Sequence, residues 1–218
     1  MSSRRFPGKV LAPLWGKPIL WHTINRMIEA GLSAEEIVIL TSTHSSDDPV
    51  AAYAHDIGFP VFRGSLEDVM ARFVGAIEMF PCEWILRGTA DSPLYCPEVI
   101  RRVIDMTVAG NTSFITTTYH RTLPCGTNIE AFRASLLLER LSHPSLTDED
   151  REHVTRIFHR IPPCDGAVSV EFGNSDFSGM SVAVDSPQDL SNLMELEPSR
   201  ILENIPWHQL QVRRLPQS

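Results

Sequence analysis

Short apolar runs alternate with segments of helical periodicity along most of this chain of 218 residues. The runs, rich in β-branched and aromatic residues, cover positions 37–40, 59–62, 84–86, 113–117, 168–172 and 182–184. Between them, apolar residues recur at steps of three and four over 19–28, 69–77 and 99–104. Buried strands that alternate with amphipathic helices are typical of βαβ units. The pattern predicts an α/β fold in which helices cover both faces of a mostly parallel sheet.

The composition excludes several classes of protein. The formal net charge of −8 argues against a nucleic-acid-binding face, which needs clustered cations, whereas a single triphosphate requires only a few. No apolar run reaches the roughly 18 residues of a membrane span. The stretch from Met1 to Lys9 is polar and basic, unlike a secretory signal, so the expected location is the cytoplasm.

A basic loop occupies positions 4–9, where two arginines, a proline, a glycine and a lysine follow one another closely. Gly8 allows the backbone to approach an anion. Arg5 and Lys9 offer positive charge and hydrogen-bond donors to phosphate oxygens. An ordinary basic loop is the alternative interpretation, and this stretch alone does not decide between the two.

Two aspartates each follow a predicted buried strand. Asp91 comes after the run at 84–86, and Asp185 comes after the run at 182–184. Ligands of open α/β sheets bind outside the carboxyl ends of the strands, and Mg²⁺ prefers carboxylate oxygens together with substrate phosphates. Each aspartate could instead be a helix cap or a turn residue. A more specific hypothesis is that both carboxylates bind one metal ion at the carboxyl edge of the sheet.

The segment 63–73 is predicted to contain a strand end, a glycine turn and the start of a helix. Ser65 is a candidate cap with Asp68 as its capping-box partner. The helix N-terminus could face an anion or a base edge, although an ion pair between Asp68 and Arg72 is an equally simple explanation. Histidine is a common acid–base group, but a lone histidine on a helix, such as His153, is more often structural. No nucleophile elbow or serine–histidine–aspartate pattern is present, which argues against covalent catalysis.

In chain order, several segments resemble the motifs of the spore-coat-polysaccharide cytidylyltransferase-like family, which is related to the synthetases of CMP-activated acidic sugars. The matching segments are 5–11 (R-L-P-G-K-x-L), 16–20 (G-K-P-[ML]-[LI]), 41–48 (A-T-S…D-D), 62–73 (F-R-G-S-x-x-D-V-L-x-R-[YF]), 87–93 (R-x-x-[GA]-D-x-P), 151–155 (R-E-H-V-T) and 184–190 (V-D-[TS]-P-x-D-L). Each motif is weak alone, but the ordered set spans residues 3–190 and is specific.

The resemblance implies a Rossmann-like nucleotide-diphospho-sugar transferase fold and an enzyme that transfers CMP from CTP to a small sugar-like acid. It implies that Arg5 and Lys9 face the triphosphate and that Asp91 and Asp185 hold Mg²⁺, with Lys9, Arg5 and Asp91 as the catalytic groups. The residues implied near the nucleotide are Gly8, Ser42, Asp48, Gly64, Ser65 and Arg72. Glu130 and His153 are the candidates for the acceptor side. Related enzymes suggest a homodimer.

The expected organisation is a nucleotidyltransferase domain at 1–196, with a β-rich acceptor-side insertion at 111–180 and a C-terminal tail at 197–218. The sequence departs from the family at two points. The family has a buried first strand and an Ala-Arg pair before the position of Met1, and both are missing here. Either the start is mis-assigned or trimmed, or the fold tolerates an empty central position in the sheet. Cys125 and Asn128 replace common acids, so the identity of the acceptor stays open.

Two other functions remain possible from the sequence. A glycosyltransferase of the same fold would consume a nucleotide-sugar, but it has no need of the basic loop at 4–9. A non-catalytic nucleotide-binding subunit would be compatible with the missing first strand. Release of pyrophosphate from CTP separates the cytidylyltransferase from both.

Overall fold

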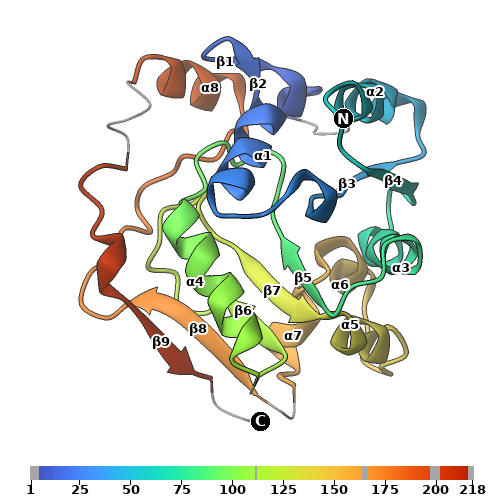
Figure 1. Ribbon diagram of the computed structural model, residues 1–218, viewed down its shortest axis with the longest axis vertical. Helices are drawn as coiled ribbons and strands as arrows, with labels where there is room; N and C mark the ends of the chain where they lie inside the picture. The colour runs from blue at the N-terminus through green and yellow to red at the C-terminus, as the bar shows by residue number, and fades with distance from the viewer. Residues whose placement is uncertain (1–4, 111, 164–165, 197–201, 216–218) are drawn as a thin grey trace.

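The computed structural model describes residues 5–110, 112–163, 166–196 and 202–215. Its main sheet has five strands in the spatial order β5-β7-β6-β8-β9 (Figure 1). In chain order they are β5 (Trp84–Arg87), β6 (Phe114–Thr116), β7 (Glu130–Arg133), β8 (Ala167–Phe172) and β9 (Leu210–Arg214). The helices that pack against this sheet confirm the predicted α/β class.

The strand directions differ in detail from the mostly parallel sheet that the sequence predicts. β6 and β8 are parallel, whereas the pairs β5·β7, β6·β7 and β8·β9 are antiparallel. The chain returns from β6 to β7 through residues 117–129 without forming a helix. A parallel pair needs a crossover connection, usually helical, so a strand that returns directly lies antiparallel to its neighbour. The result is a mixed sheet.

A second, smaller sheet pairs β3 (Ile39–Ser42) with β4 (Val61–Gly64) in parallel, and α2 (Asp48–Asp56) supplies the crossover. A short hairpin joins β1 (Pro13–Leu14) to β2 (Lys17–Pro18). Among the described residues no strand joins β3 to β5. The pair β3·β4 therefore forms a sheet separate from the main one.

Helices lie on both faces of the main sheet, as predicted (Figure 1). Ile115 and Ala131 face α1 (Ile19–Glu29) and α4 (Pro97–Val108). Phe114 and Phe132, their neighbours along the strands, lie in the cluster on the opposite face, because successive side chains of a strand alternate. The other helices are α3 (Val69–Met79), α5 (Ala134–Leu141), α6 (Asp148–His153), α7 (Arg156–Arg160) and α8 (Pro187–Met194), with 3-10 turns at Lys9–Leu11, Ala34–Glu36, Ser45–Asp47 and Trp207–Gln209.

Three segments differ from their expected form. The segment 111–180, expected to be a β-rich insertion, contains α5, α6 and α7, and its strands belong to the main sheet. Residues 182–184 form no strand ladder, and a single isolated bridge pairs Cys125 with Ser181 just before them. In the expected tail at 197–218, positions 197–201 and 216–218 lie outside the described residues, whereas β9 pairs with β8 and so belongs to the sheet. None of the helices in the described ranges is long and apolar enough to cross a membrane.

Candidate active site

The basic loop near the N-terminus is a tight turn fixed by its own backbone. Gly8 has φ 78°, a left-handed conformation that glycine adopts without the cost of a Cβ atom. The N–H of Lys9 donates to the carbonyl of Phe6 at 3.2 Å, and the N–H of Leu11 donates to the carbonyl of Gly8 at 2.9 Å. Phe6 packs beside the buried Val184. The turn therefore presents Lys9 in a fixed direction.

Lys9 joins the two aspartates that the sequence singles out. Its Nζ atom lies 2.6 Å from Oδ2 of Asp91 and 2.9 Å from Oδ1 of Asp185. Arg5 adds a second cation, with Nη2 at 3.2 Å from Oδ2 of Asp185. Burial disfavours the charged form of Lys9, but the hydrogen bonds that it donates to both carboxylates outweigh burial and raise the pKa of Lys9. The hydrogen bond from Lys9 lowers the pKa of Asp185.

Backbone contacts explain why Asp91 and Asp185 meet. The N–H of Val184 donates to the carbonyl of Asp91 at 3.0 Å, which holds the two segments side by side. Ser186, not Asp185, caps α8, and its capping-box partner is Asp189. The N-cap of α4 is Cys96, so Asp91 caps no helix either. Neither aspartate is therefore the N-cap that the alternative interpretation expected, and both carboxylates face Lys9.

The two aspartates fit a divalent cation. One carboxylate oxygen of each already lies within 3 Å of a single positive centre, the Nζ atom of Lys9. Mg²⁺ takes oxygen ligands and often uses only one or two carboxylates, with water and substrate phosphates completing the shell. In the described ranges no group of three or more His, Cys, Asp or Glu side chains could hold a metal ion. The pair thus suits an ion shared with a phosphate substrate rather than one in an all-protein cage.

The polar end of β3 is organised by Asp47, a residue that the sequence analysis did not single out. Its Oδ2 atom accepts hydrogen bonds from the side chain of Ser42 at 2.6 Å and from that of Thr41 at 3.0 Å. Burial opposes the charge of Asp47, but these hydrogen bonds lower its pKa. Asp48 is a nucleotide candidate, yet its side chain is 60% exposed and pairs with Arg63 at 2.6 Å. Arg63 in turn donates to the carbonyl of Ser42 at 2.8 Å, so Asp48 supports this end of β3 indirectly.

The turn from β4 to α3 brings three nucleotide candidates together. A Cβ atom on Gly64 would lie 3.0 Å from Cγ of Arg72, so a larger residue there would require the side chain of Arg72 to shift by a few tenths of an ångström. The side chain of Arg72 donates to the carbonyl of Ser65 at 2.6 and 3.0 Å. The expected pair between Asp68 and Arg72 is not formed, because Asp68 pairs with Arg151 at 2.9 Å. Asp68 also caps α3, the role expected for Ser65. Burial lowers the pKa of Arg72.

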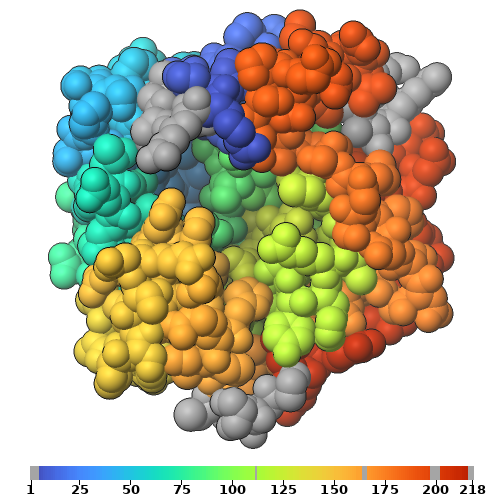
Figure 2. Space-filling model, turned by 180° about the vertical axis from the view of Figure 1, so that it is seen from behind, coloured from blue at the N-terminus to red at the C-terminus, as the bar shows by residue number. Residues whose placement is uncertain are grey.

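These segments border a cleft of about 650 Å³. Its polar and charged lining residues are Thr41, Asp47, Glu67, Arg72, Glu152 and His153. Figure 2 shows a recess in the molecular surface where the N-terminal loop (blue), the segment at the start of α3 (teal) and α6 (yellow-orange) meet. His153, a candidate for the acceptor side, therefore lies at the edge of a space large enough for a small ligand.

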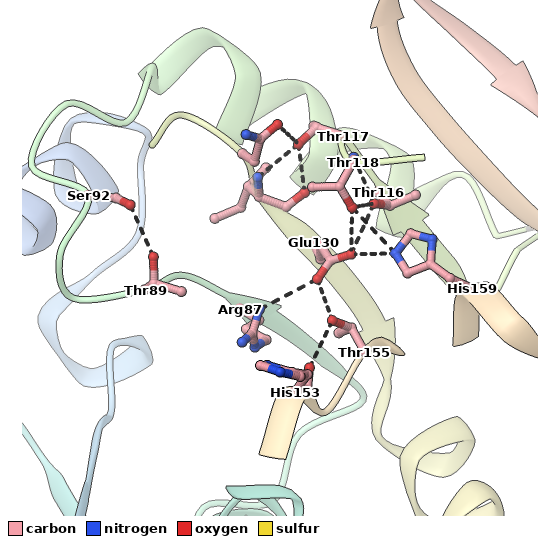
Figure 3. A network of polar contacts seen from close by, with 12 residues as sticks. Arg87, Thr89, Ser92, Thr116, Thr117, Thr118, Glu130, His153, Thr155 and His159 are labelled. Carbon is pink, nitrogen blue, oxygen red and sulfur yellow. Dashed lines mark hydrogen bonds and ion pairs between the residues drawn. The ribbon is translucent and has the colours of Figure 1, made fainter. Parts of the chain in front are cut away.

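Glu130 lies at the centre of a buried polar network (Figure 3). Its Oε1 atom accepts from Thr116, Thr118 and His159 at 2.9 to 3.1 Å, and its Oε2 atom accepts from Thr155 at 2.5 Å. Burial alone would raise the pKa of Glu130, but the hydrogen bonds from His159 and Thr155, with the charge of Arg87, lower it to about 2. Glu130 is therefore an anion that organises its neighbours.

The network also fixes a strained turn beside the cleft. Val154, which separates His153 from Thr155, has φ 57° and is fully buried. Such a conformation is unusual for a β-branched residue and persists where surrounding contacts enforce it. The hydrogen bond from Thr155 to Glu130 and the burial of Val154 supply those contacts. The turn ends α6 at His153 and so sets where that side chain enters the cleft lining.

The comparison with known families covers nearly all of the chain. The family model described as Cytidylyltransferase matches residues 1–205. The chain belongs to the cytidylyltransferase family.

Relatives of this cytidylyltransferase agree with that assignment. It is 34% identical over 165 residues to the spore coat polysaccharide biosynthesis protein SpsF of Bacillus subtilis, covering 74% of this chain and 68% of that protein. It is 28% identical over 109 residues to the 3-deoxy-manno-octulosonate cytidylyltransferase of Lawsonia intracellularis, covering 48% of this chain and 41% of that enzyme. A solved cytidylyltransferase from Leptospira borgpetersenii superposes with a TM-score of 0.83 at 26% identity, over 96% of this chain and 93% of that one.

The site of the cytidylyltransferase also contains residues that the sequence analysis did not select. Asp47 adjoins the candidate Asp48, and Thr155 ends the R-E-H-V-T segment, so sequence position offered a weak signal for both. Arg87 begins the R-x-x-[GA]-D-x-P segment, which is a similar weak signal, whereas His159 belongs to no such segment; neither could be recognised as a partner of Glu130, because they come from β5 and α7. Residues that meet through the tertiary fold alone cannot be paired from periodicity.

Proposed function

We propose that this cytidylyltransferase transfers CMP from CTP to a sugar-like acid and releases pyrophosphate, in the synthesis of a cell-surface polysaccharide or glycan precursor. The observation that carries the proposal is the convergence of Asp91 and Asp185 on Lys9, beside Arg5. The spore-coat and octulosonate relatives support the class of product and acceptor.

In the proposed reaction an oxygen of the acceptor attacks the α-phosphorus of CTP. The new P–O bond forms as the bond between the α-phosphorus and the bridging oxygen of pyrophosphate breaks. Asp91 and Asp185 would hold Mg²⁺, which supplies charge neutralisation to the phosphate oxygens. Lys9 and Arg5 stabilise the negative charge of the leaving pyrophosphate, and catalysis consists of positioning and electrostatic stabilisation.

The nucleotide would lie along the cleft between the basic loop and α3. Gly8 allows the loop backbone to approach a phosphate, while Ser42, Gly64, Ser65 and Arg72 border the base and ribose. Among the described residues, the guanidinium of Arg72 donates hydrogen bonds to backbone carbonyls and to no carboxylate. Its positive charge can therefore attract an anionic ligand. Asp48 acts through Arg63 on the end of β3. Glu130 and His153 belong to the acceptor side, in the segment 111–180.

A pyrophosphate-release screen tests this function. CTP, ATP, GTP and UTP are each combined with Mg²⁺ and a panel of acidic sugars, sugar phosphates and phosphonates. The proposal requires release that depends on CTP and on an acidic acceptor, with CMP joined to that acceptor by mass spectrometry. Release of a nucleoside diphosphate from a nucleotide-sugar would instead identify a glycosyltransferase, and binding of CTP without turnover would identify a non-catalytic subunit.

We also propose a homodimer located in the cytoplasm. Three apolar side chains near α8, Met180, Met194 and Leu196, are 39%, 55% and 48% exposed, and Met180 and Leu196 line a second cavity of about 310 Å³. Exposed apolar patches often mark protein interfaces. Light scattering on the purified protein measures the mass of the particle, and a value near the 24.4 kDa of one chain would exclude the dimer.

A further inference from the structure

Arg87 ends β5, four positions before Asp91, and faces Glu130 across the β5·β7 pair. Its side chain is 22% exposed, so most of it is withdrawn from water. Its one polar contact among the described residues is an ion pair with Oε2 of Glu130 at 3.5 Å, which is too long for a good hydrogen bond. A guanidinium carries five N–H donors in a planar fork, and those of Arg87 remain available.

The comparison with Arg133 shows that this lack of partners is a property of the site. Arg133 lies at the opposite end of the same strand pair, facing Trp84, and is 23% exposed. It is ion-paired with Glu83 and stacks over the ring of Trp84 at 4.8 Å. The side chains of Arg87 and Arg133 are thus almost equally exposed and lie on the same strand pair. Among the described residues, however, only the side chain of Arg133 makes hydrogen bonds.

Arg87 balances the charge of Glu130, but this long ion pair leaves the hydrogen-bond donors of Arg87 unused. The carboxylate of Glu130 already accepts four hydrogen bonds, from Thr116, Thr118, His159 and Thr155. Figure 3 shows Arg87 and His153 on the same side of Glu130, with His159 on another. Glu130 therefore holds the guanidinium by charge and leaves its hydrogen-bond donors unused.

The location of Arg87 indicates that it would bind the acceptor rather than the triphosphate. The cations of the basic loop, Arg5 and Lys9, approach Asp91 and Asp185 from one side. Arg87 instead pairs with Glu130 of β7, which contacts α7 and the turn before it. An anion on Arg87 would thus lie beside Glu130, which neither Arg5 nor Lys9 contacts among the described residues.

We infer that Arg87 binds the carboxylate of the acceptor through a bidentate hydrogen-bonded ion pair, and that Glu130 is its positioning residue. Arginine matches carboxylate geometry with two parallel N–H···O bonds, which a lysine cannot reproduce. A neutral sugar would leave a half-buried cation without a partner, so Arg87 would select acids over neutral sugars. This inference rests on the proposed cytidylyltransferase function.

Calorimetry without divalent ions, which prevents turnover, tests the inference. The wild type and the variants Arg87→Gln, Arg87→Lys and Arg133→Gln are first titrated with CTP. Each CTP-saturated protein is then titrated with 3-deoxy-manno-octulosonate and with its uncharged methyl ester. Arg133→Gln is the matched control, because it removes an equally buried arginine from the same strand pair.

The wild type should bind the acid about 10-fold or more tightly than the ester, as expected for a charged hydrogen-bonded pair. Arg87→Gln should weaken the acid by about 10- to 100-fold and leave the ester unchanged, and Arg87→Lys should fall between. Arg133→Gln should match the wild type, and the affinity for CTP should stay within about twofold throughout, which also shows that the variants are folded.

Three results would overturn the assignment of Arg87. These are equal binding of acid and ester by the CTP-loaded wild type, unchanged acid binding in Arg87→Gln, or a loss of CTP affinity in Arg87→Gln as large as the loss of acid affinity. Failure of the wild type to bind CTP both with and without Mg²⁺ would remove the proposed function, and the role of Arg87 with it. A wild type that binds CTP but neither sugar would count against Arg87 alone.

Discussion

The ammonium group of Lys9 lies 2.6 Å from the Oδ2 atom of Asp91, across a separation of 82 residues. The same nitrogen lies 2.9 Å from Oδ1 of Asp185. Two carboxylates this close repel one another unless a cation lies between them. Lys9 therefore holds together the two groups that are proposed to bind the divalent ion, and we expect it to compete with that ion for their carboxylates.

Replacing Asp91 by Asn should reduce turnover by about 100-fold or more, the scale of losing one preorganised electrostatic group. The amide keeps the shape of the side chain but removes the negative charge that faces Lys9. Pyrophosphate release at saturating Mg²⁺ and CTP measures the effect. Asp176→Asn, an exposed aspartate whose hydrogen bond serves only its own turn, should retain full activity. Near-normal turnover in Asp91→Asn would refute its role.

Replacing Lys9 by Met should have opposite effects on turnover and on metal binding. Turnover should fall by about 100-fold, because a cation for the leaving pyrophosphate is lost. Without nucleotide, however, Mn²⁺ should bind about 10-fold more tightly, since the competing ammonium has gone and the two carboxylates keep their charge.

Electron paramagnetic resonance of free Mn²⁺ measures that affinity. Lys17→Met removes the other lysine of the chain, which lies over Trp21, and should leave both quantities unchanged. If Lys9→Met binds Mn²⁺ no better than the wild type, Lys9 does not compete for the metal position.

Glu130→Gln should lower stability in a way that depends on pH. The pKa of Glu130 lies near 2 in the folded protein, below its usual value of 4.5. A carboxylate with a depressed pKa stabilises the folded state above its unfolded pKa, and this contribution is lost as the pH falls through the folded value. The difference corresponds to about 3 kcal/mol.

Urea denaturation from pH 7 to pH 2.5 checks this prediction. The gap in unfolding free energy between the wild type and Glu130→Gln should be constant above about pH 5.5 and should shrink below about pH 4.5. Asp47 and Asp150, whose pKa values are also lowered, titrate in both proteins and cancel in the difference. A gap that does not change with pH would show that Glu130 acts through packing instead of charge.

The sequence was most informative where function depends on the ends of secondary-structure elements. Asp91 follows β5 by four residues, whereas Asp185 follows an apolar run that forms no strand ladder, so the expected convergence holds without the second expected strand. The structure brings them together through the backbone contact between Val184 and Asp91. The start of α3 at Val69 and the glycine turn before it are also local features of the sequence. Gly64 ends β4 where that turn was expected.

The remaining parts of the site depend on contacts that no local pattern encodes. Asp47 and Asp48 are adjacent and chemically identical, and only the direction of the 3-10 turn at Ser45–Asp47 decides which one reaches Ser42. The donors around Glu130 come from separate elements of the fold. The antiparallel direction of β7 likewise follows from the connection before it, which contains no helix. Apolar periodicity does not reveal whether such a connection crosses over or returns directly.

Gly126→Ala should disturb Asp185 from a distance, because Gly126 packs on the segment that leads to it. Gly126 has φ +90°, and a Cβ atom there would lie 2.5 Å from the backbone nitrogen of Ala183. The N–H of Val182 also donates to the carbonyl of Cys125 at 2.8 Å, so the two segments cannot separate without losing that bond. Displacement of residues 182–184 would move Asp185 away from Lys9.

Gly58→Ala separates this clash from ordinary backbone strain, since Gly58 has φ +83° but nothing within 4 Å of the added atom. Strain alone should cost each variant about 1 to 2 kcal/mol, and the clash should cost Gly126→Ala about 1 to 3 kcal/mol more. Urea denaturation measures the stability, and pyrophosphate release measures the site. Gly58→Ala should keep its turnover, whereas Gly126→Ala should lose most of it even where it remains folded. Equal losses of stability with full turnover in both variants would show that the segment before Asp185 can yield without moving the aspartate.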